Sequence, residues 1–366
     1  MSSSTPLVLV TGASGFVGSH LVRALVEEGA HVRAMVRTTS RLESLEGLPV
    51  EIVGGDLEHP ESFPPAVQGA EVAYHCAAKV GEAGPLAAYR RANVRGTLEL
   101  ARAAAAAGVG RFVYLSSSSV LGMVNHQGTT EDAPYLRCGD PYADSKVEAE
   151  QALLEYCRRA DLPYVVLRPG IIYGPGDRYI LPSLVRSLLR GRIFLINDGS
   201  GVLPCCYIEN LVPVIVAAGR RPQALNQIYN LTDARRVTAG EFIGTLAGIL
   251  DVPAPEFSIP YPAARALCAV AETAHRLRRK KSPPRFSKGA LRFLGLSRDF
   301  DVSKAVRDLD LRCRVGLPEA LRRSIEWMRA TGLLAAVEPE AGKKSPSFSI
   351  AERAFIAGAK ALVGGR

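Results

Sequence analysis

The sequence predicts an α/β protein built on a doubly wound parallel sheet, and two observations support this prediction. Short apolar runs of strand length alternate with longer runs of helical length through the first half of the chain, which is typical of repeated β–α–β units. The apolar runs are nearly continuous, as expected for strands that are covered on both faces. The predicted strands lie at 7–12, 31–37, 50–56, 71–78, 111–117 and 163–170, and the predicted helices at 16–29, 86–107 and 141–160.

The pattern changes after residue 175, where Gly and Pro become frequent, helices dominate and strands are isolated. The stretch 227–232 is an exception, because it reads as one more strand of the sheet. A linker-like composition follows near the C-terminus. We therefore predict a sheet domain at 1–175 plus 202–232, a smaller, mostly helical substrate domain at 176–201 and 233–335, and a linker with a short amphipathic tail helix at 336–366.

The composition fits a folded protein of two domains and a tail. Of the 366 residues, 47% are hydrophobic and 22% charged, which excludes wholesale disorder. Seven cysteines lack CxxC spacing and six histidines lack metal-ligand spacing, so we expect no metal site and a reducing compartment. No apolar stretch approaches the ~20 residues that span a bilayer, and the N-terminus does not resemble a secretory signal. The sequence thus predicts a cytoplasmic protein.

The net charge of +9 is concentrated in "RLRRKK" at 276–281 and near Arg322 and Arg323. A basic run usually forms a solvated face, and the alternatives are phosphate, nucleic acid or an anionic membrane. We expect no nucleic-acid partner, because no nucleic-acid motif or aromatic platform accompanies the run. The apolar, base-flanked helix at 262–281 either packs on the substrate domain or lies on a membrane surface. The sequence leaves both options open, and likewise whether the chain is a homodimer.

Three glycines, Gly12, Gly15 and Gly18, lie between the first strand and the first helix. Glycine permits the tight turn, lets backbone amides approach a pyrophosphate and allows close helix–strand packing. The N-terminus of the following helix then faces the phosphates. In this strand–turn–helix context the loop predicts a dinucleotide site of the Rossmann type; the alternative is a glycine-rich turn without a ligand.

The end of the second strand bears on the choice of dinucleotide. In a Rossmann unit an acid there binds the ribose 2′-hydroxyl, whereas an arginine accommodates a 2′-phosphate. The strand at 31–37 ends in Arg37 with no acid nearby, and Arg41 follows. This favours NADP(H); the alternative is that Arg37 stacks on the adenine and NAD binds.

The stretch "DPYADSKVEAE" at 140–150 places a phenol beside a cation. Asp140 and Pro141 are typical of a helix start, and on that helix Tyr142 and Lys146 share a face. A free tyrosine has a pKa of about 10 and is a poor base at neutral pH, but a neighbouring ammonium lowers that pKa. The pattern predicts a tyrosine that exchanges a proton with the substrate; the alternative is a solvated helix face.

Several motifs occur in an order that is characteristic of one enzyme family. They are "TGASGFVG" (11–18), "GGDL" (54–57), "HCAA" (75–78), "NVRGTLEL" (93–100), "YLSSSSVLG" (114–122), "YADSK" (142–146) and "RPGIIYGPG" (168–176). Together they resemble the extended subgroup of the short-chain dehydrogenase/reductase superfamily over residues 5–330. The resemblance implies a Rossmann-like fold and a nicotinamide dinucleotide cofactor.

The resemblance also implies a Ser–Tyr–Lys catalytic site. It places the serine five residues before Gly122, at Ser117, with Ser118 and Ser119 as second choices, and it gives Lys146 a further role on the nicotinamide ribose. The implied cofactor contacts are Gly12, Gly15, Phe16, Val17 and Gly18 at the pyrophosphate, Asp56 and Leu57 at the adenine, Ala77, Ala78, Lys79, Pro169, Gly170, Ile171 and Ile172 at the nicotinamide, and Asn93 as a supporting residue.

Two enzyme classes share this machinery: nucleotide-sugar epimerases and dehydratases, and the 3β-hydroxysteroid dehydrogenase branch with its sterol-4-carboxylate 3-dehydrogenases. Many sugar-nucleotide enzymes carry an Asn two residues after the Pro of their "RP" motif, where this chain has Ile171. The stretch 298–328 also resembles the hydroxysteroid branch, and Tyr207 in "CCYIENLV" matches a segment that closes the substrate pocket.

We therefore predict an NAD(P)-dependent oxidoreductase that oxidises the 3β-hydroxyl of a sterol or related polycyclic lipid, with decarboxylation if a 4-carboxyl is present. The alternative is a nucleotide-sugar 4-epimerase or dehydratase. A third option is a nucleotide-sensing or scaffold protein that has lost catalysis. The intact Ser117, Tyr142 and Lys146 argue against this third option.

Overall fold

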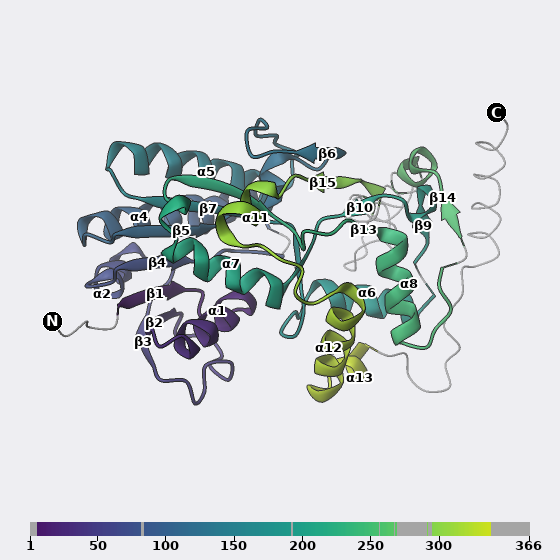
Figure 1. The fold of residues 1–366 in the computed structure, drawn as a ribbon, viewed down its shortest axis with the longest axis horizontal. Coiled ribbons are helices and arrows are strands. Elements are labelled where there is room, and N and C mark those ends of the chain that lie inside the picture. Colours follow the sequence, from purple (N-terminus) through teal and green to yellow (C-terminus); the bar gives the residue numbers. More distant parts are fainter. Residues whose placement is uncertain are drawn as a thin grey trace.

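A computed structural model describes residues 6–81, 84–191, 193–255, 257–266, 268, 291 and 295–337. A sheet covered by helices forms one part, on the left of Figure 1, and a smaller part lies beside it on the right. The basic run at 276–281 and the residues after 337 lie outside the described residues. Within the described residues, no helix is both long enough and apolar enough to cross a membrane.

The central sheet has seven strands in the order β12-β7-β5-β4-β1-β2-β3, and every neighbouring pair is parallel. From β1 the chain adds β2 and β3 on one side. It then crosses to β4 on the other side of β1 and adds β5, β7 and β12 beyond it. The point between β1 and β4 is thus the topological switch point, where doubly wound sheets bind ligands. All the predicted strands are confirmed: β1 (Leu7–Thr11), β2 (His31–Val36), β3 (Val50–Gly54), β4 (Val72–His75), β5 (Arg111–Leu115), β7 (Tyr164–Pro169) and β12 (Gln227–Leu231).

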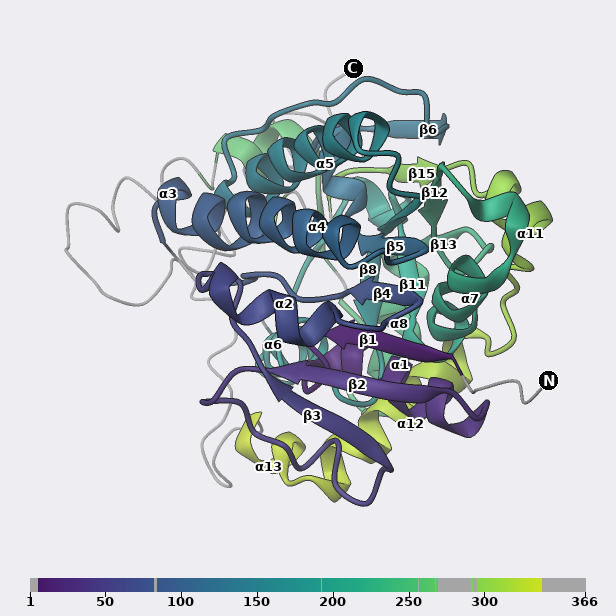
Figure 2. The ribbon, with the colours of Figure 1, turned by 90° about the vertical axis from the view of Figure 1, so that its left-hand side faces the viewer.

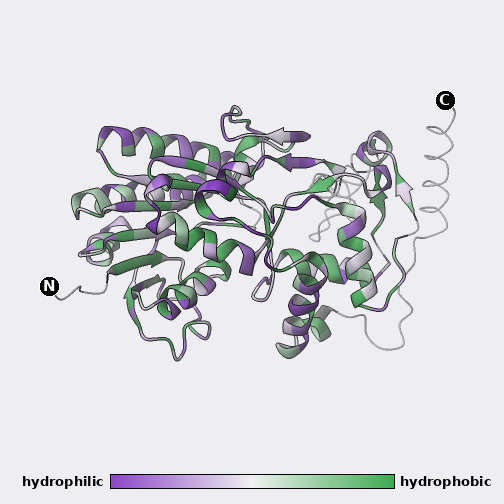
Figure 3. Cartoon of the chain, in the orientation of Figure 1, coloured by the Kyte–Doolittle hydropathy of each residue, from purple (hydrophilic) through white to green (hydrophobic). Residues whose placement is uncertain are grey.

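Helices cover both faces of the sheet (Figure 2). One face packs on α1 (Phe16–Glu27) and α7 (Ile208–Arg220), and the other on α2 (Phe63–Val67), α4 (Thr97–Ala106) and α5 (Pro141–Arg159). Figure 3 shows hydrophobic residues along strands of the sheet and both hydrophobic and hydrophilic residues along the helices around it. This two-sided burial explains why the central strands β1, β4, β5 and β7 are near-continuous apolar runs, whereas the edge strand β3 is largely exposed.

The predicted helix at 86–107 consists of three segments. It begins as α3 (Leu86–Tyr89), continues as a π-helical stretch over Arg90–Gly96 and ends as α4. A Cβ on Gly96 would come within 2.6 Å of the Leu57 carbonyl oxygen, so the chain needs glycine at this close approach. The wider π-helical turn carries Asn93 into the buried interior.

The smaller part consists of short elements and packed helices. They are α6 (Ile180–Leu189), β9 (Leu195–Ile196), β10 (Val202–Leu203), β13 (Val237–Thr238), α8 (Ala239–Ile249), β14 (Ser258–Ile259), α12 (Leu317–Ala330) and α13 (Leu333–Val337). β10 pairs with β13 and is not a strand of the seven-stranded sheet. Conversely, α11 (Ser303–Leu309) returns to the sheet, because the Tyr229 hydroxyl of β12 donates to Asp308 at 3.2 Å.

Two short strand pairs join the two parts near the carboxyl end of the sheet. β8 (Ile171–Tyr173), which directly follows β7, pairs with β11 (Cys205–Tyr207). β6 (His126–Thr129), which follows the serine-rich segment, pairs with β15 (Arg298–Phe300). These pairs bring segments that are far apart in the sequence to the edge where the predicted site lies.

Candidate active site

The glycine loop forms a close backbone junction at the end of β1. Gly12 has a φ of +66°, and a Cβ there would lie 2.9 Å from the backbone of Ala77. A Cβ on Gly18 would lie 2.1 Å from the Gly12 carbonyl oxygen. Helix α1 starts after Gly15 with no side-chain cap and no acid in its first turn. Its first amides are therefore available to an anion, which fits the pyrophosphate of a dinucleotide.

A buried histidine links this loop to the neighbouring strands. The ring of His75 makes hydrogen bonds of 2.8 Å to the hydroxyl groups of both Thr11 and Thr97. The Thr11 hydroxyl also accepts from the Ala77 amide at 3.3 Å. Burial lowers the pKa of His75 to about 3, so the ring is neutral. Sequence reasoning assigned no role to His75, although it lies inside the "HCAA" motif.

The start of α5 brings the predicted tyrosine to the predicted serine. Asp140 caps the helix by accepting from the Ala143 amide at 2.9 Å, and the Ser117 side chain lies near enough to the Tyr142 phenol to lower its pKa. Ser118 and Ser119 are buried, whereas Ser117 is partly exposed. Among the three serines, Ser117 is thus the one placed to share a substrate oxygen with Tyr142.

The lysine lies differently from the sequence-based expectation. The Lys146 ammonium donates to the Leu115 carbonyl at 2.8 Å and to the Tyr114 hydroxyl at 3.2 Å, so it is turned toward β5. Burial raises the pKa of Tyr142 to about 12, and the Ser117 side chain offsets only part of that rise. The expected lowering of the Tyr142 pKa is therefore not produced by these side chains alone. Desolvation lowers the pKa of Lys146 to about 8.

A buried ion pair lies one helical turn beyond the lysine. Glu150 and Arg168 are both shielded from solvent, and their shortest contact is 2.6 Å. Glu150 also accepts from the hydroxyl groups of Tyr135, at 3.0 Å, and Ser116. Its negative charge raises the pKa of Lys146 and so opposes the desolvation. Sequence reasoning missed this pair, although Glu150 lies four residues after Lys146 on the same helix face.

Asn93 connects the predicted nicotinamide side to α5. Its side-chain oxygen accepts from the Lys79 amide at 2.7 Å, and its amide group donates to the Lys79 carbonyl at 3.1 Å and to the Ser145 hydroxyl at 3.0 Å. The Ser145 hydroxyl in turn donates to the Tyr142 carbonyl at 2.7 Å. Asn93 thus fixes the segment after β4 relative to the helix turn that carries Tyr142.

The segment after β7 has an apolar character. Gly170 is tightly enclosed, since a Cβ there would lie 2.0 Å from the Pro204 carbonyl oxygen. Ile171, next to it, donates its amide to Pro204 at 2.7 Å and is paired with Cys205. Ile171 and Ile172 remain partly exposed. The predicted nicotinamide segment therefore presents aliphatic side chains at the carboxyl end of the sheet.

The predicted adenine side lies at the ends of β2 and β3. Arg37 follows β2 directly and is exposed. Asp56 closes a turn by accepting from the Glu58 amide at 3.0 Å. Leu57 is buried and forms the contact with Gly96 described above. Arg37 is therefore accessible to a ribose substituent, and no acid ends β2.

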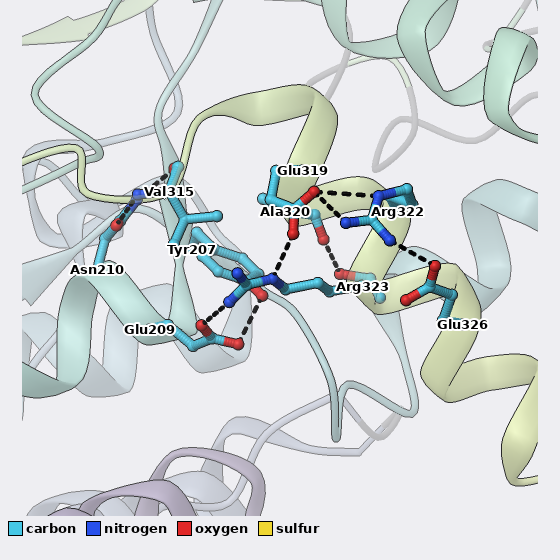
Figure 4. A network of polar contacts seen from close by, with 10 residues as sticks. Tyr207, Glu209, Asn210, Val315, Glu319, Ala320, Arg322, Arg323 and Glu326 are labelled. Carbon is cyan, nitrogen blue, oxygen red and sulfur yellow. Dashed lines mark hydrogen bonds and ion pairs between the residues drawn. The ribbon is translucent and has the colours of Figure 1, made fainter.

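Tyr207 ends β11 and is paired with Tyr173, two residues beyond Ile171 in β8. It is fully buried, so it presents no surface to a ligand. Figure 4 shows its hydroxyl group directed to Glu209, to which it donates at 2.9 Å, and the same carboxylate binds Arg323 of α12. The expected pocket-lining tyrosine thus anchors the start of α7 to α12 instead.

The chain matches the sequence model of a known enzyme family. The sequence model described as the NAD dependent epimerase/dehydratase family matches residues 8–232, more than half of the chain. The chain belongs to this family. The NAD-dependent epimerase/dehydratase family acts on CH–OH groups, so the protein is an enzyme of that oxidoreductase type.

Three curated relatives span different activities within the epimerase/dehydratase family. A 2-alkyl-3-oxoalkanoate reductase of Stenotrophomonas maltophilia (strain K279a) is 32% identical over 86% of this chain and 97% of its own. A UDP-glucose 4-epimerase of Vibrio cholerae is 34% identical over 69% and 78%. A 3β-hydroxysteroid dehydrogenase/decarboxylase (isoform 1) of Arabidopsis thaliana is 31% identical over 87% and 78%.

Solved structures of the epimerase/dehydratase fold superpose on this chain. The structure of gox2253 has a TM-score of 0.76 at 26% identity and covers 90% of this chain and 99% of its own. MoeE5, solved with UDP-glucuronic acid and NAD, has a TM-score of 0.68 at 27% identity over 88% and 99%. These likenesses confirm the predicted Rossmann-like fold.

Proposed function

We propose that this protein oxidises the 3β-hydroxyl of a sterol or a related polycyclic lipid, with NADP or NAD as hydride acceptor. The observation that carries the proposal is Ile171, a partly exposed aliphatic residue on β8 directly after Gly170. Many sugar-nucleotide enzymes that this sequence resembles carry an Asn at the position of Ile171. The amide group of that Asn contacts the diphosphate of their substrate.

The surroundings of Ile171 are apolar as well. Its partner in β11 is Cys205, and Val202, Leu203 and Pro204 lead into that strand. A ring lipid gains ~25 cal/mol for each Å² of apolar surface that it buries against such a wall. A diphosphate desolvated at Ile171 would find no polar partner in that side chain, which disfavours its binding.

The chain's own groups account for the proton transfer. Ser117 is placed to donate a hydrogen bond to the substrate oxygen, and the Tyr142 phenolate takes the hydroxyl proton as the C3–H bond breaks with its electron pair. When bound, the oxidised nicotinamide supplies the hydride acceptor and a positive charge that favours the phenolate. Asn93 and Glu150 hold the helix turns around Tyr142 and Lys146 in position.

A carboxyl group next to the new ketone would extend the reaction. Oxidation at C3 of a 4-carboxysterol gives a β-keto acid, which loses carbon dioxide as the C–C bond electrons form an enolate that then takes a proton. The names of two relatives support substrates of this type, since one is a 3-oxoalkanoate reductase and the other a hydroxysteroid dehydrogenase/decarboxylase. Decarboxylation requires no further catalytic group from the protein.

The proposed cofactor preference rests on Arg37. This exposed arginine follows β2, and no acid stands there to bind a ribose 2′-hydroxyl. A guanidinium forms strong charge-assisted hydrogen bonds to a phosphate. We therefore propose that NADP(H) binds more tightly than NAD(H), within a family that is described as NAD-dependent.

A nucleotide-sugar 4-epimerase or dehydratase is the second candidate. The 34% identity to the Vibrio cholerae UDP-glucose 4-epimerase favours it. In that reaction the same Ser117 and Tyr142 would oxidise a sugar carbon only transiently, so no reduced cofactor would accumulate. This difference in cofactor balance separates the two candidates.

The test is to incubate purified protein with NAD or NADP and follow the absorbance of the reduced cofactor. We expect 3β-hydroxysterols, with and without a 4-carboxyl, to reduce the cofactor stoichiometrically, and Tyr142→Phe to slow this reduction ~10²–10⁴-fold. UDP-glucose should neither turn over nor protect the protein against heat. Epimerisation of UDP-glucose without sterol activity would reject the proposal and establish the second candidate.

A further inference from the structure

Arg298 on β15 is a buried arginine that has no carboxylate partner among the described residues. Only 6% of its surface is exposed. One terminal nitrogen donates toward the Met123 sulfur at 3.7 Å, while Nε and the other terminal nitrogen have no hydrogen-bond partner there. Burial lowers the pKa of Arg298 to about 10, so the side chain stays charged at neutral pH. A buried charge without a counterion is costly.

A second buried arginine shows how this fold normally satisfies such a group. Arg168 is 1% exposed, and its guanidinium makes hydrogen bonds of 2.9 and 2.6 Å to Glu150. Its remaining terminal nitrogen donates to the Glu131 carbonyl at 2.9 Å. Arg168 is therefore fully compensated within the chain. Among the described residues no group does the same for Arg298, so its guanidinium is able to take an anionic partner.

The strand places Arg298 on the side of the catalytic helix. β15 lies beside β6 at the top of Figure 1. Arg298 and Phe300 are both buried, while Asp299 between them pairs with Arg236 at 3.2 Å nearer the surface. Phe300 packs in a small cluster with Val147, the neighbour of Lys146. The buried side of β15 thus faces the elements that carry the candidate catalytic residues.

Two neighbours of Arg298 belong to segments that also carry candidate site residues. Met123, which the guanidinium contacts, directly follows the turn that begins after Ser117 and ends at Gly122. The charge of Arg298 also lowers the pKa of the Cys205 thiol, and Cys205 is the partner of Ile171 in the β8–β11 pair. Arg298 is thus linked to the segment after Ser117 by a contact and to the β8–β11 pair by its charge.

The packing around Arg298 leaves room for movement. It borders a cavity of about 370 Å³ whose lining includes Val202 and Pro204. Two carboxylates also line this cavity, but Asp299 pairs with Arg236, and Asp301 accepts from the Ser303 amide at 2.7 Å. Both acids are thus already engaged. The guanidinium can reorient toward an incoming anion without competing with a fixed ion pair.

We propose that Arg298 binds a carboxylate of the substrate, attached to the carbon next to the one that bears the reacting hydroxyl. This proposal rests on the proposed function, because it assumes that the substrate oxygen lies between Ser117 and Tyr142. A guanidinium can take a carboxylate through two parallel hydrogen bonds, which fixes orientation as well as affinity. Arg298 is then the residue that selects 3-hydroxy or 3-oxo acids over neutral lipids.

The experiment compares acids with their neutral methyl esters. The two probe pairs are a 3β-hydroxysterol-4-carboxylic acid with its ester, and an acyclic 2-alkyl-3-hydroxyalkanoic acid with its ester. Binding is measured by calorimetry in the presence of the reduced cofactor, which cannot accept hydride from the hydroxy compounds. The wild-type protein should bind each acid about 10- to 100-fold more tightly than its ester. Arg298→Met should remove this preference and leave ester affinity unchanged, and Arg298→Lys should retain part of it.

A stability measurement on the ligand-free protein separates binding from a structural role. Arg298→Met removes an unpaired buried charge, so its melting temperature should not fall. Arg168→Met is the matched control, because it leaves Glu150 buried without its partner and should melt at a lower temperature. A melting temperature for Arg298→Met as low as that of the control, with acid and ester affinities reduced together, would overturn the proposal.

The remaining outcomes distinguish this proposal from the proposed function. If the sterol pair binds but acid and ester bind equally, the assignment of Arg298 fails and the proposed function stands. If only the acyclic pair shows a preference that depends on Arg298, the assignment stands and the polycyclic substrate fails. If neither pair binds, both are overturned.

Discussion

Acidification should destabilise this protein through one buried histidine. His75 is 1% exposed and held neutral between Thr11 and Thr97, with a pKa of about 3 instead of 6.5. Below pH 6.5 the unfolded chain binds a proton at this histidine that the folded protein does not bind. The free energy of unfolding therefore falls as pH falls from 6.5 toward 3. At pH 5 the loss from this group amounts to about 2 kcal/mol.

Urea unfolding at pH 7.5 and pH 5 measures this loss directly. His75→Gln keeps a donor and an acceptor in the side chain but cannot titrate, so the difference between its two free energies should be about 2 kcal/mol smaller than in the wild type. His31→Gln, at an exposed position in β2, is the control and should behave like the wild type. The reasoning is refuted if His75→Gln loses as much stability on acidification as the wild type does.

The other predictions concern the site and one buried acid. Tyr142→Phe should lower turnover ~10²–10⁴-fold while cofactor affinity, measured by calorimetry, stays unchanged; Lys146→Ala should reduce both. Arg37→Ala should weaken NADP(H) binding by ~1.5–3 kcal/mol and leave NAD(H) binding nearly unchanged; equal losses for the two cofactors would show that Arg37 does not bind the 2′-phosphate. Burial raises the pKa of Asp233 to about 6, so the folded state holds a proton between pH 4 and 6 that the unfolded chain has lost. The contribution of Asp233 to the free energy of unfolding therefore rises as pH falls through 6. Urea unfolding at several pH values should show that this contribution is absent in Asp233→Asn.

The sheet could be predicted from the sequence because its central strands are covered on both faces. β1, β4, β5 and β7 are near-continuous apolar runs, and this signal is local, whereas β3 at the sheet edge is largely exposed. The helix cap at Asp140 and the turn at Gly12 could also be predicted from the sequence. Asp supplies a capping oxygen and Gly tolerates a positive φ, so the residue type itself indicates the local structure.

The parts of the candidate site that the sequence did not predict depend on contacts between residues that are distant in the chain. Thr11 and His75 are 64 positions apart, and Arg168 meets Glu150 from another element. No local pattern specifies such pairs. The direction of Lys146 is a similar case, since the helix period places it beside Tyr142 but the carbonyl of Leu115 draws its ammonium away.

The burial of Tyr207 also could not be predicted from the local sequence. Its segment matched a pocket-closing motif, yet the acid two residues later and Arg323 of α12 hold its hydroxyl group in the interior. A motif predicts which strand approaches a site, whereas the packing of the opposite helix decides which side chains of that strand face it.

One measurement tests the central claim, that Ser117 and Tyr142 serve the net oxidation of a ring 3β-hydroxyl. A 3β-hydroxysterol deuterated at C3 is incubated with the protein and oxidised cofactor, and the reduced cofactor is analysed by mass spectrometry. We predict that the deuterium appears in the reduced cofactor in step with 3-ketone formation, and that Tyr142→Phe forms both products ~10²–10⁴-fold more slowly. Absence of deuterium transfer from any sterol, together with interconversion of UDP-glucose and UDP-galactose by the same preparation, would contradict the claim.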